Sequence, residues 1–219
     1  MRLSRLLNNL DYNLIGPIDD PEIDLLVYDS RKVSPNCLFV CLKGTRADGH
    51  DYAAEAVSSG AAAVVVERKL NLKCPQVLAK NSRQALARLA VNYYHYPAER
   101  LILAGVTGTN GKTTTVHMLK SIAEKNFKSA LIGTVGLKID ARGYRFLPNT
   151  TPESLDFQAI LNEMLDNGVE FVAAEISSHG LKTHRLDYCR FDPAISRGRP
   201  AGWNGSILIS SRLSRTQTL

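Results

Sequence analysis

A glycine-rich turn joins an apolar segment to an amphipathic one near the middle of this chain. Residues 101–106 are apolar apart from Gly105, which is typical of a strand buried on both faces of a parallel sheet. Apolar residues then recur at helical spacing, at Val116, Leu119, Ile122 and Ala123. The turn between them reads Gly105-Val-Thr-Gly-Thr-Asn-Gly-Lys-Thr-Thr-Thr115. A buried strand, a glycine turn and a helix in this order predict a phosphate-binding loop in an α/β fold.

The chemistry of this turn points to a nucleoside triphosphate. Glycines let successive backbone N–H groups face phosphate oxygens, and the helix dipole adds to the attraction. Lys112 would reach the outer phosphates and the Thr113 hydroxyl would ligate Mg²⁺. The loop is a variant, since the strict pattern would place a glycine at Val106. The candidate ATP-binding residues are Gly108, Thr109, Asn110, Gly111, Lys112, Thr113 and Thr114. The alternative is a flexible loop with a solvated lysine.

Composition is ordinary for a globular protein. The 219 residues are 44% hydrophobic and 22% charged, and no run approaches the roughly 18 apolar residues of a membrane span. We therefore expect no membrane insertion and, with no signal peptide at the N-terminus, a cytoplasmic location. The four cysteines form no Cys-x-x-Cys pair, which argues against a zinc site. Cys37 and Cys41 share the parity of one strand face and are predicted to be buried apolar residues.

The formal net charge of +6 does not indicate a nucleic-acid ligand. Four arginines without any acid account for +4 within residues 193–219, so the rest of the chain is nearly neutral. Aromatic residues do not interleave with those arginines apart from Trp203, and no reader motif is present.

The pattern of apolar segments predicts two α/β units that divide near Tyr96-Pro97. Residues 1–97 contain predicted strands at 25–28, 37–42, 61–66 and 77–79 and helices at 52–58 and 84–94, with Ser82 as a helix cap. Residues 98–194 contain strands at 101–106, 129–135 and 169–174 and helices at 113–125 and 153–167, with Thr151 as cap and Pro152 in the first turn. The predicted fold class is a small N-terminal α/β domain followed by an incomplete P-loop-type parallel-sheet ATPase domain.

Glu175 follows the last of these strands. In open parallel sheets the carboxyl ends of the strands face the ligand crevice, so this acid is expected beside the phosphate loop. A carboxylate there can bind Mg²⁺ together with Thr113. The alternative is a surface glutamate at a strand end, and the nearby His179, His184 and Arg185 are by themselves typical of a solvated turn.

Seven segments resemble the Mur ligases of peptidoglycan synthesis, and the resemblance covers nearly all of residues 20–192. They are Asp29-Ser-Arg31, Leu38-Phe-Val-Cys-Leu-Lys-Gly44, Asp48-Gly-His-Asp51, Gly60-Ala-Ala-Ala-Val-Val65, Gly108-Thr-Asn-Gly-Lys-Thr-Thr114, Asn149-Thr-Thr-Pro-Glu153 and Glu175-Ile-Ser-Ser-His-Gly-Leu181 with Arg185. The Asn-Thr-Thr-Pro-Glu and Glu-x-Ser-Ser-His-Gly-Leu segments are similar to the family member that adds the third peptide residue to UDP-N-acetylmuramoyl-L-alanyl-D-glutamate.

The resemblance implies an ATP-dependent amide ligase with Mg²⁺. Such ligases convert a substrate carboxylate to an acyl phosphate, which the amine of the incoming diamino acid attacks, and positioning and charge neutralisation carry such a transfer. Lys112 and Glu175 would be the catalytic residues, with Thr113 and Glu175 at the metal. Ser30, Thr45 and Arg46 would contact the UDP-sugar. The peptide arm would contact Asn149, Thr150, Thr151, Ser177, Thr183 and Arg185.

The resemblance stops after Ala194. The family continues with a Thr-Asn-Leu segment, an Asp-His-Leu-Asp-Tyr-His segment, a carbamylated lysine and a third domain, whereas this chain has a basic Ser/Arg-rich tail at 195–219. A shifted reading frame would produce such a tail, and a genuine short terminus would too. We expect this tail to be poorly ordered. A central sheet that ends after three strands would also expose an edge.

Two functional hypotheses follow. In the first, the chain derives from an amide ligase and its residues keep the roles above, even if this polypeptide is inactive. In the second, it is a non-catalytic module that binds a UDP-sugar or a nucleotide, or it has no function. A generic P-loop kinase or GTPase is a weaker third reading, because no Asn-Lys-x-Asp motif occurs. The choice between diaminopimelate and lysine would depend on the third domain.

Overall fold

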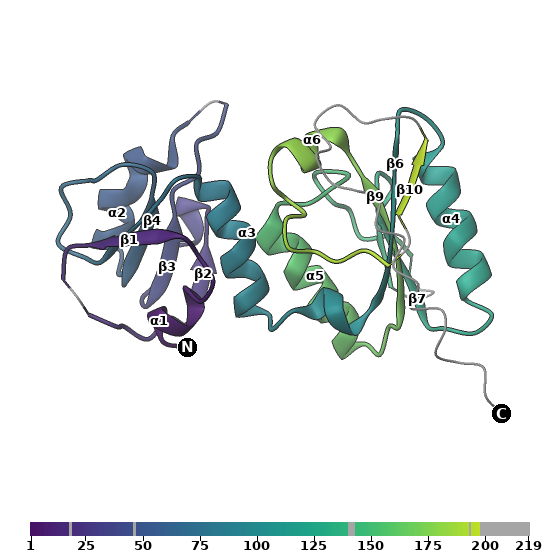
Figure 1. The fold of residues 1–219 in the computed structure, drawn as a ribbon, viewed down its shortest axis with the longest axis horizontal. Coiled ribbons are helices and arrows are strands. Elements are labelled where there is room, and N and C mark those ends of the chain that lie inside the picture. Colours follow the sequence, from purple (N-terminus) through teal and green to yellow (C-terminus); the bar gives the residue numbers. More distant parts are fainter. Residues whose placement is uncertain (18, 46, 140–142, 193, 198–219) are drawn as a thin grey trace. The chain divides into compact units, whose positions relative to one another are not determined.

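The computed structural model describes residues 1–17, 19–45, 47–139, 143–192 and 194–197. The chain divides into two compact units, one ending at His95 and the other beginning at Tyr96. Each unit is built on a five-stranded sheet (Figure 1). The predicted α/β fold class is therefore confirmed.

The first unit has a mostly parallel sheet in the order β1-β5-β4-β3-β2. Strands β2, β3, β4 and β5 run parallel to one another, and β1 pairs antiparallel with β5. Its buried centre includes Cys37 and Cys41, as their shared parity predicts. The elements of this unit are α1 (Leu3–Leu6), β1 (Tyr12–Ile15), β2 (Leu25–Val27), η1 (Ser30–Lys32), β3 (Cys37–Val40), η2 (Gly49–Tyr52), α2 (Ala53–Ser58), β4 (Ala63–Val66), β5 (Gln76–Ala79) and α3 (Ser82–Tyr93).

The second unit has its sheet in the order β10-β6-β9-β7-β8. Strand β8 is antiparallel to β7, and the other pairings are parallel. The elements are η3 (Pro97–Arg100), β6 (Ile102–Gly108), α4 (Lys112–Ala123), β7 (Ser129–Gly133), β8 (Gly136–Lys138), α5 (Ser154–Asp166), β9 (Phe171–Ile176), α6 (Ser178–Lys182) and β10 (Ala194–Arg197).

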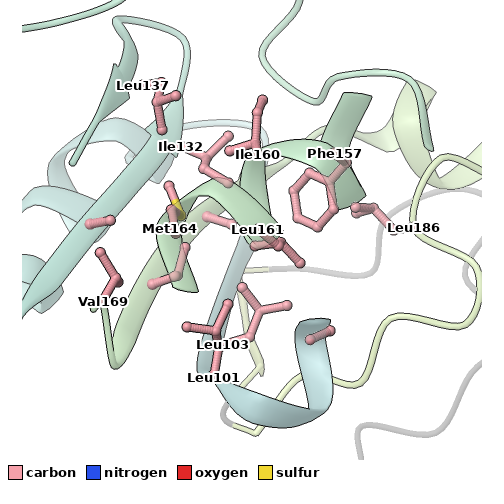
Figure 2. Packing of buried hydrophobic residues seen from close by; sticks show 14 of the residues in the cluster. Leu101, Leu103, Ile132, Leu137, Phe157, Ile160, Leu161, Met164, Val169 and Leu186 are labelled. Carbon is pink, nitrogen blue, oxygen red and sulfur yellow. The ribbon is translucent and has the colours of Figure 1, made fainter. Parts of the chain in front are cut away.

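Helices α4 and α5 cover opposite faces of this second sheet (Figure 1). On the α5 face, Leu103 and Ile132 pack with Phe157, Leu161 and Met164 of the helix (Figure 2). On the α4 face the buried cluster is smaller and contains Ala104, Val106, Val116, Leu131 and Ala173. Side chains alternate between the two faces along each strand. A strand residue therefore lies on the same sheet face as the cluster residue two positions away from it.

Two predicted helix caps are wrong. The cap of α3 is Asn81, whose side-chain oxygen accepts hydrogen bonds from the N–H groups of Arg83 and Gln84. Ser82 is the first helical residue, and its own N–H donates to Glu67. Glu153 caps α5 and accepts from Ser154 N–H, so the helix begins after Pro152. In both helices the preceding residue, in extended backbone, supplies the oxygen that the free N–H groups need.

The prediction that Ile122 belongs to the buried apolar face of α4 is also wrong. The Ile122 side chain is 67% exposed, and Lys120 occupies a buried position on this helix instead. The ammonium of Lys120 pairs with Glu124 one turn later, which allows the charge to be buried.

The structure adds strands that the sequence pattern did not predict. Strands β1 and β8 form the antiparallel edges of the two sheets. Strand β10 pairs in parallel with β6, so the expected edge after a third strand is covered there. Strand β10 takes in residues 195–197 of the predicted poorly ordered tail, and residues 198–219 lie outside the described part of the chain, so this stays a prediction. Among the described residues no helix is both long and apolar enough to cross a membrane.

Candidate functional site

The glycine-rich loop follows β6 and opens α4, as predicted. Gly108 and Gly111 have φ values of 143° and 80°, backbone conformations that cost other residues about 1–2 kcal/mol. Gly111 is the residue that caps α4. The Lys112 ammonium folds back over the loop and donates to the carbonyl oxygen of Gly108 at 2.6 Å and to that of Thr109 at 3.4 Å. The carbonyl oxygens of the loop therefore bind the ammonium group of the loop's own Lys112.

The exposed side of this loop carries the polar residues that were predicted to hold ATP. Thr109, Asn110 and Thr114 are exposed, and Thr113 lies half-buried in the first turn of α4. The neighbouring Thr115 hydroxyl donates to the carbonyl oxygen of Gly111 at 2.8 Å.

Glu175 lies inside β9 rather than after it, next to β6, the strand that leads into this loop. Its backbone is in register with Val106 of the adjacent strand β6. It shares the parity of Ala173, so it belongs to the sheet face that α4 covers. The first turn of α4 stands at the carboxyl end of β6 on this same face. Strand order and parity thus bring Glu175 to the same end and face of the sheet as Thr113.

The Glu175 side chain is only 1% exposed, and one neighbour binds both of its carboxylate oxygens. The backbone N–H of Thr134 donates to Oε1 at 3.1 Å, and the Thr134 hydroxyl donates to Oε2 at 3.0 Å. Gly133 leaves the room that this carboxylate fills, since a Cβ there would lie 2.8 Å from Glu175 Cδ. A buried carboxylate needs such donors, because desolvation would otherwise destabilise its charged form.

The segment 149–151 is hydrogen-bonded to Thr134 and to the backbone at the end of β9. Thr150 Oγ1 lies 3.1 Å from Thr134 Oγ1. The buried Thr151 hydroxyl donates to the carbonyl oxygen of Glu175 at 3.2 Å and accepts from Ser177 N–H at 2.9 Å. Asn149 is exposed. Thr150 is thus held beside the end of β7, and Thr151 against the end of β9.

Ser177, Thr183 and Arg185 belong to the short helix α6 and the turn that follows it. Ser177 caps α6 by accepting from Gly180 N–H at 3.0 Å, and the Thr183 hydroxyl donates to the carbonyl oxygen of His179 at 2.7 Å. The Arg185 guanidinium donates to the carbonyl oxygen of Thr151 at 2.7 Å and lies 3.5 Å from a carboxylate oxygen of Glu153. Arg185 therefore fastens the segment 149–151 to α6.

Ser30 and Thr45 belong to the first unit. Ser30 begins η1 after β2, and Thr45 follows β3, the parallel neighbour of β2. Both residues therefore follow the carboxyl ends of neighbouring parallel strands, which lie at the same end of the sheet. Arg46, the third predicted UDP-sugar contact, lies outside the described residues.

Two carboxylates near these residues are held in their charged form. A side-chain hydrogen bond from Arg31 lowers the pKa of Asp29 to about 2. A hydrogen bond from the backbone N–H of His50 lowers the pKa of Asp48, and the His50 and Arg68 side chains add to the effect. Both acids cap 3-10 helices, where a carboxylate satisfies free N–H groups.

Sequence reasoning missed three residues of this site, namely Gly133, Thr134 and Glu153. A signal for the first two was present, because they stand at the carboxyl end of the predicted strand 129–135, the same position that singled out Glu175. Glu153 was predicted as part of a helix rather than as the cap and the partner of Arg185.

Comparisons with known proteins place this geometry in one family. Residues 22–104 match the model described as "Mur ligase family, catalytic domain", and residues 106–196 match the Mur ligase middle domain. A UDP-N-acetylmuramoyl-L-alanyl-D-glutamate–2,6-diaminopimelate ligase of Geobacillus thermodenitrificans is 48% identical over 196 residues. That match takes in 89% of this chain and 40% of the relative, so the chain spans about two fifths of the relative's length.

Solved structures give the same result. A structure of a UDP-N-acetylmuramoyl-L-alanyl-D-glutamate–2,6-diaminopimelate ligase matches with a TM-score of 0.73 and 26% identity, over 94% of this chain and 42% of that one. The MurF ligase of Thermotoga maritima in complex with ADP matches with a TM-score of 0.50 and 25% identity, over 79% of this chain and 37% of that one. The family resemblance of the sequence motifs is confirmed, and this chain belongs to the Mur ligase family.

Proposed function

We propose that this chain carries two units of an ATP-dependent ligase that adds 2,6-diaminopimelate to UDP-N-acetylmuramoyl-L-alanyl-D-glutamate in the cytoplasm. The observation that carries the proposal is the placement of Glu175 at the same end and face of the sheet as Thr113 and the glycine-rich loop. The names of the similar ligases support the substrate and favour diaminopimelate over lysine.

The residues at this end of the sheet fit a magnesium nucleotide. A threonine hydroxyl and a single carboxylate are hard oxygen ligands, and Mg²⁺ in nucleotide sites commonly combines one or two carboxylates with phosphate oxygens. Within the described residues no group of three or more His, Cys, Asp or Glu forms a separate metal cage. Thr113 and Glu175 are therefore the proposed metal ligands. When bound, Mg²⁺ would neutralise charge on the phosphates.

The other residues would bind and orient. Lys112 would exchange the loop carbonyls of Gly108 and Thr109 for phosphate oxygens, to which a charged donor binds more strongly. Ser30, Thr45 and Arg46 are the proposed UDP-sugar contacts. The peptide arm would meet Asn149, Thr150, Ser177 and Thr183, while Thr151 and Arg185 keep this surface in place through their internal hydrogen bonds.

The test measures binding and turnover with this chain. We expect micromolar to millimolar binding of Mg²⁺-ATP and at least about a 10-fold loss of affinity in Lys112→Ala, because a charge-assisted hydrogen bond contributes about 1.5–3 kcal/mol. The matched control is Lys125→Ala, which removes an exposed lysine just beyond the other end of α4. GTP should compete poorly, whereas a generic P-loop GTPase would prefer it.

Phosphate release distinguishes the two remaining readings. Release that requires both the UDP-linked dipeptide and diaminopimelate would assign ligase turnover to these two units. Binding of both ligands without release would assign them the binding part of the ligase. If the chain binds neither Mg²⁺-ATP nor the UDP-linked dipeptide, the proposal is wrong.

A further inference from the structure

The Thr134 hydroxyl stands between two groups that the proposed function assigns to different ligands. It lies 3.0 Å from Oε2 of Glu175, the proposed metal ligand, and 3.1 Å from Oγ1 of Thr150, a proposed contact of the peptide arm. No role is assigned to Thr134 in the proposal above. Its place at the carboxyl end of β7, the parallel neighbour of β9, explains why it reaches both.

The direction of these hydrogen bonds follows from counting protons. A hydroxyl has one proton to donate, and a carboxylate only accepts. The Thr134 proton therefore points to Glu175, and Thr150 is the donor in its contact with Thr134. The three side chains form a one-way chain in which each hydrogen bond polarises the next. A change at Thr150 would consequently alter the hydrogen bond that the Thr134 hydroxyl donates to the Glu175 carboxylate.

We infer that Thr134 is a positioning residue that couples binding of the UDP-linked dipeptide to binding of Mg²⁺-nucleotide. A substrate that orders Thr150 would fix the Thr134 hydroxyl on Glu175 and so hold the carboxylate in its metal-binding orientation. The backbone N–H of Thr134 also binds Glu175, but it survives side-chain substitution, so a mutation isolates the hydroxyl. This inference rests on the proposed function.

The test compares three variants of the same chain. Thr134→Val removes the hydroxyl and keeps the shape, and Thr134→Ser keeps a hydroxyl. Ser129→Ala is the matched control, since it removes a hydroxyl from the opposite end of the same strand, where the group donates to the local Phe127 carbonyl. Circular dichroism and thermal unfolding confirm that each variant is folded.

Calorimetry measures the dissociation constant of Mg²⁺ with a non-hydrolysable ATP analogue, with and without UDP-N-acetylmuramoyl-L-alanyl-D-glutamate. We expect the dipeptide substrate to tighten nucleotide binding by at least about 5-fold in the wild type, in Thr134→Ser and in Ser129→Ala. In Thr134→Val this ratio should fall towards one. The reverse titration must give the same ratio, because coupling between two binding sites is reciprocal.

A second variant keeps the inference testable if Thr134→Val is poorly folded. Thr150→Val removes the donor and leaves the contact between Thr134 and Glu175 in place. It should also reduce the ratio towards one, and the double variant should show no further loss. Undiminished coupling in a folded Thr134→Val or Thr150→Val protein, or a wild type that binds the two ligands independently, would overturn this inference alone. Failure of the wild type to bind either ligand would overturn the proposed function as well.

Discussion

At the scale of single residues, the buried carboxylate of Glu175 requires hydrogen-bond donors and free space from the residues around it. Thr134 supplies donors to both oxygens, and Gly133 supplies the space. The glycine is required here for its missing side chain, because it lies on the sheet face that the carboxylate occupies. At Gly111 a glycine is required for a different reason, a positive φ.

A glycine that is required for space and a glycine that is required for a positive φ should lose different amounts of stability when each is replaced by alanine. Gly133→Ala places a Cβ against the Glu175 carboxylate and should destabilise the protein by about 2 kcal/mol through overpacking. Gly168→Ala is the comparison, since Gly168 has a φ of 70° and open space around it. It should cost about 1 kcal/mol through backbone strain alone.

Urea unfolding of the two alanine variants measures both effects. A weaker Mg²⁺-nucleotide affinity is expected for Gly133→Ala only, since that substitution displaces Glu175. Equal losses of stability with unchanged affinity in both variants would show that β7 does not shape the carboxylate site.

At the scale of elements, helix starts are decided by which side chain reaches the free N–H groups. Both Asn81 and Ser82 have residue types that cap helices, and only the structure distinguishes them. Asn81 lies in extended backbone and accepts from two N–H groups, whereas the buried Ser82 hydroxyl has no hydrogen-bond partner among the residues that the structure describes.

We expect Asn81→Ala to reduce the free energy of unfolding by about 1 kcal/mol, the usual effect of losing a cap. Ser82→Ala should cost less or stabilise, because it removes a buried hydroxyl that makes no hydrogen bond within the described part of the chain. Urea denaturation at neutral pH ranks the two variants. The reverse order would show that Ser82 is the cap.

Elements with a strong internal pattern were predictable from the sequence, whereas the edge strands β1, β8 and β10 were not. The strand 101–106 and the helix 113–125 were found within a few residues of their observed bounds, because burial on both faces and helical periodicity are local signals. Strands β1, β8 and β10 have three or four residues each, too few to show a period. The pairing partners of β1 and β10, which are β5 and β6, also lie far away in the sequence.

At the scale of the whole molecule, the first unit closes on itself. The side chain of Asn92, near the end of α3, donates to the carbonyl oxygens of Leu6 and Asn8 at 2.8 and 2.7 Å. The N-terminal ammonium donates to the carbonyl oxygen of Ile23, and β1 adds the fifth strand beside β5. The first and last elements of residues 1–95 are therefore joined by hydrogen bonds within the unit.

This closure predicts that residues 1–95 fold without the rest of the chain. The isolated fragment should unfold in one cooperative urea transition, and Asn81→Ala should lower its stability by about the same 1 kcal/mol as in the full chain. Asn92→Ala should destabilise the fragment further, since it leaves two carbonyls without their donor. A fragment with no cooperative transition would contradict this interpretation of the unit.

The sequence by itself determined the family, the α/β class and the glycine-rich turn between β6 and α4, and it supplied most of the candidate site residues. These depend on local order along the chain, namely a strand, a glycine turn and a helix, and on short motifs. Only the tertiary structure decided that Glu175 is buried against Gly133, that Thr134 binds it, and that Arg185 fastens Thr151. Those contacts join residues 34 to 42 positions apart, and their partners are set by strand order and by the face on which each side chain lies.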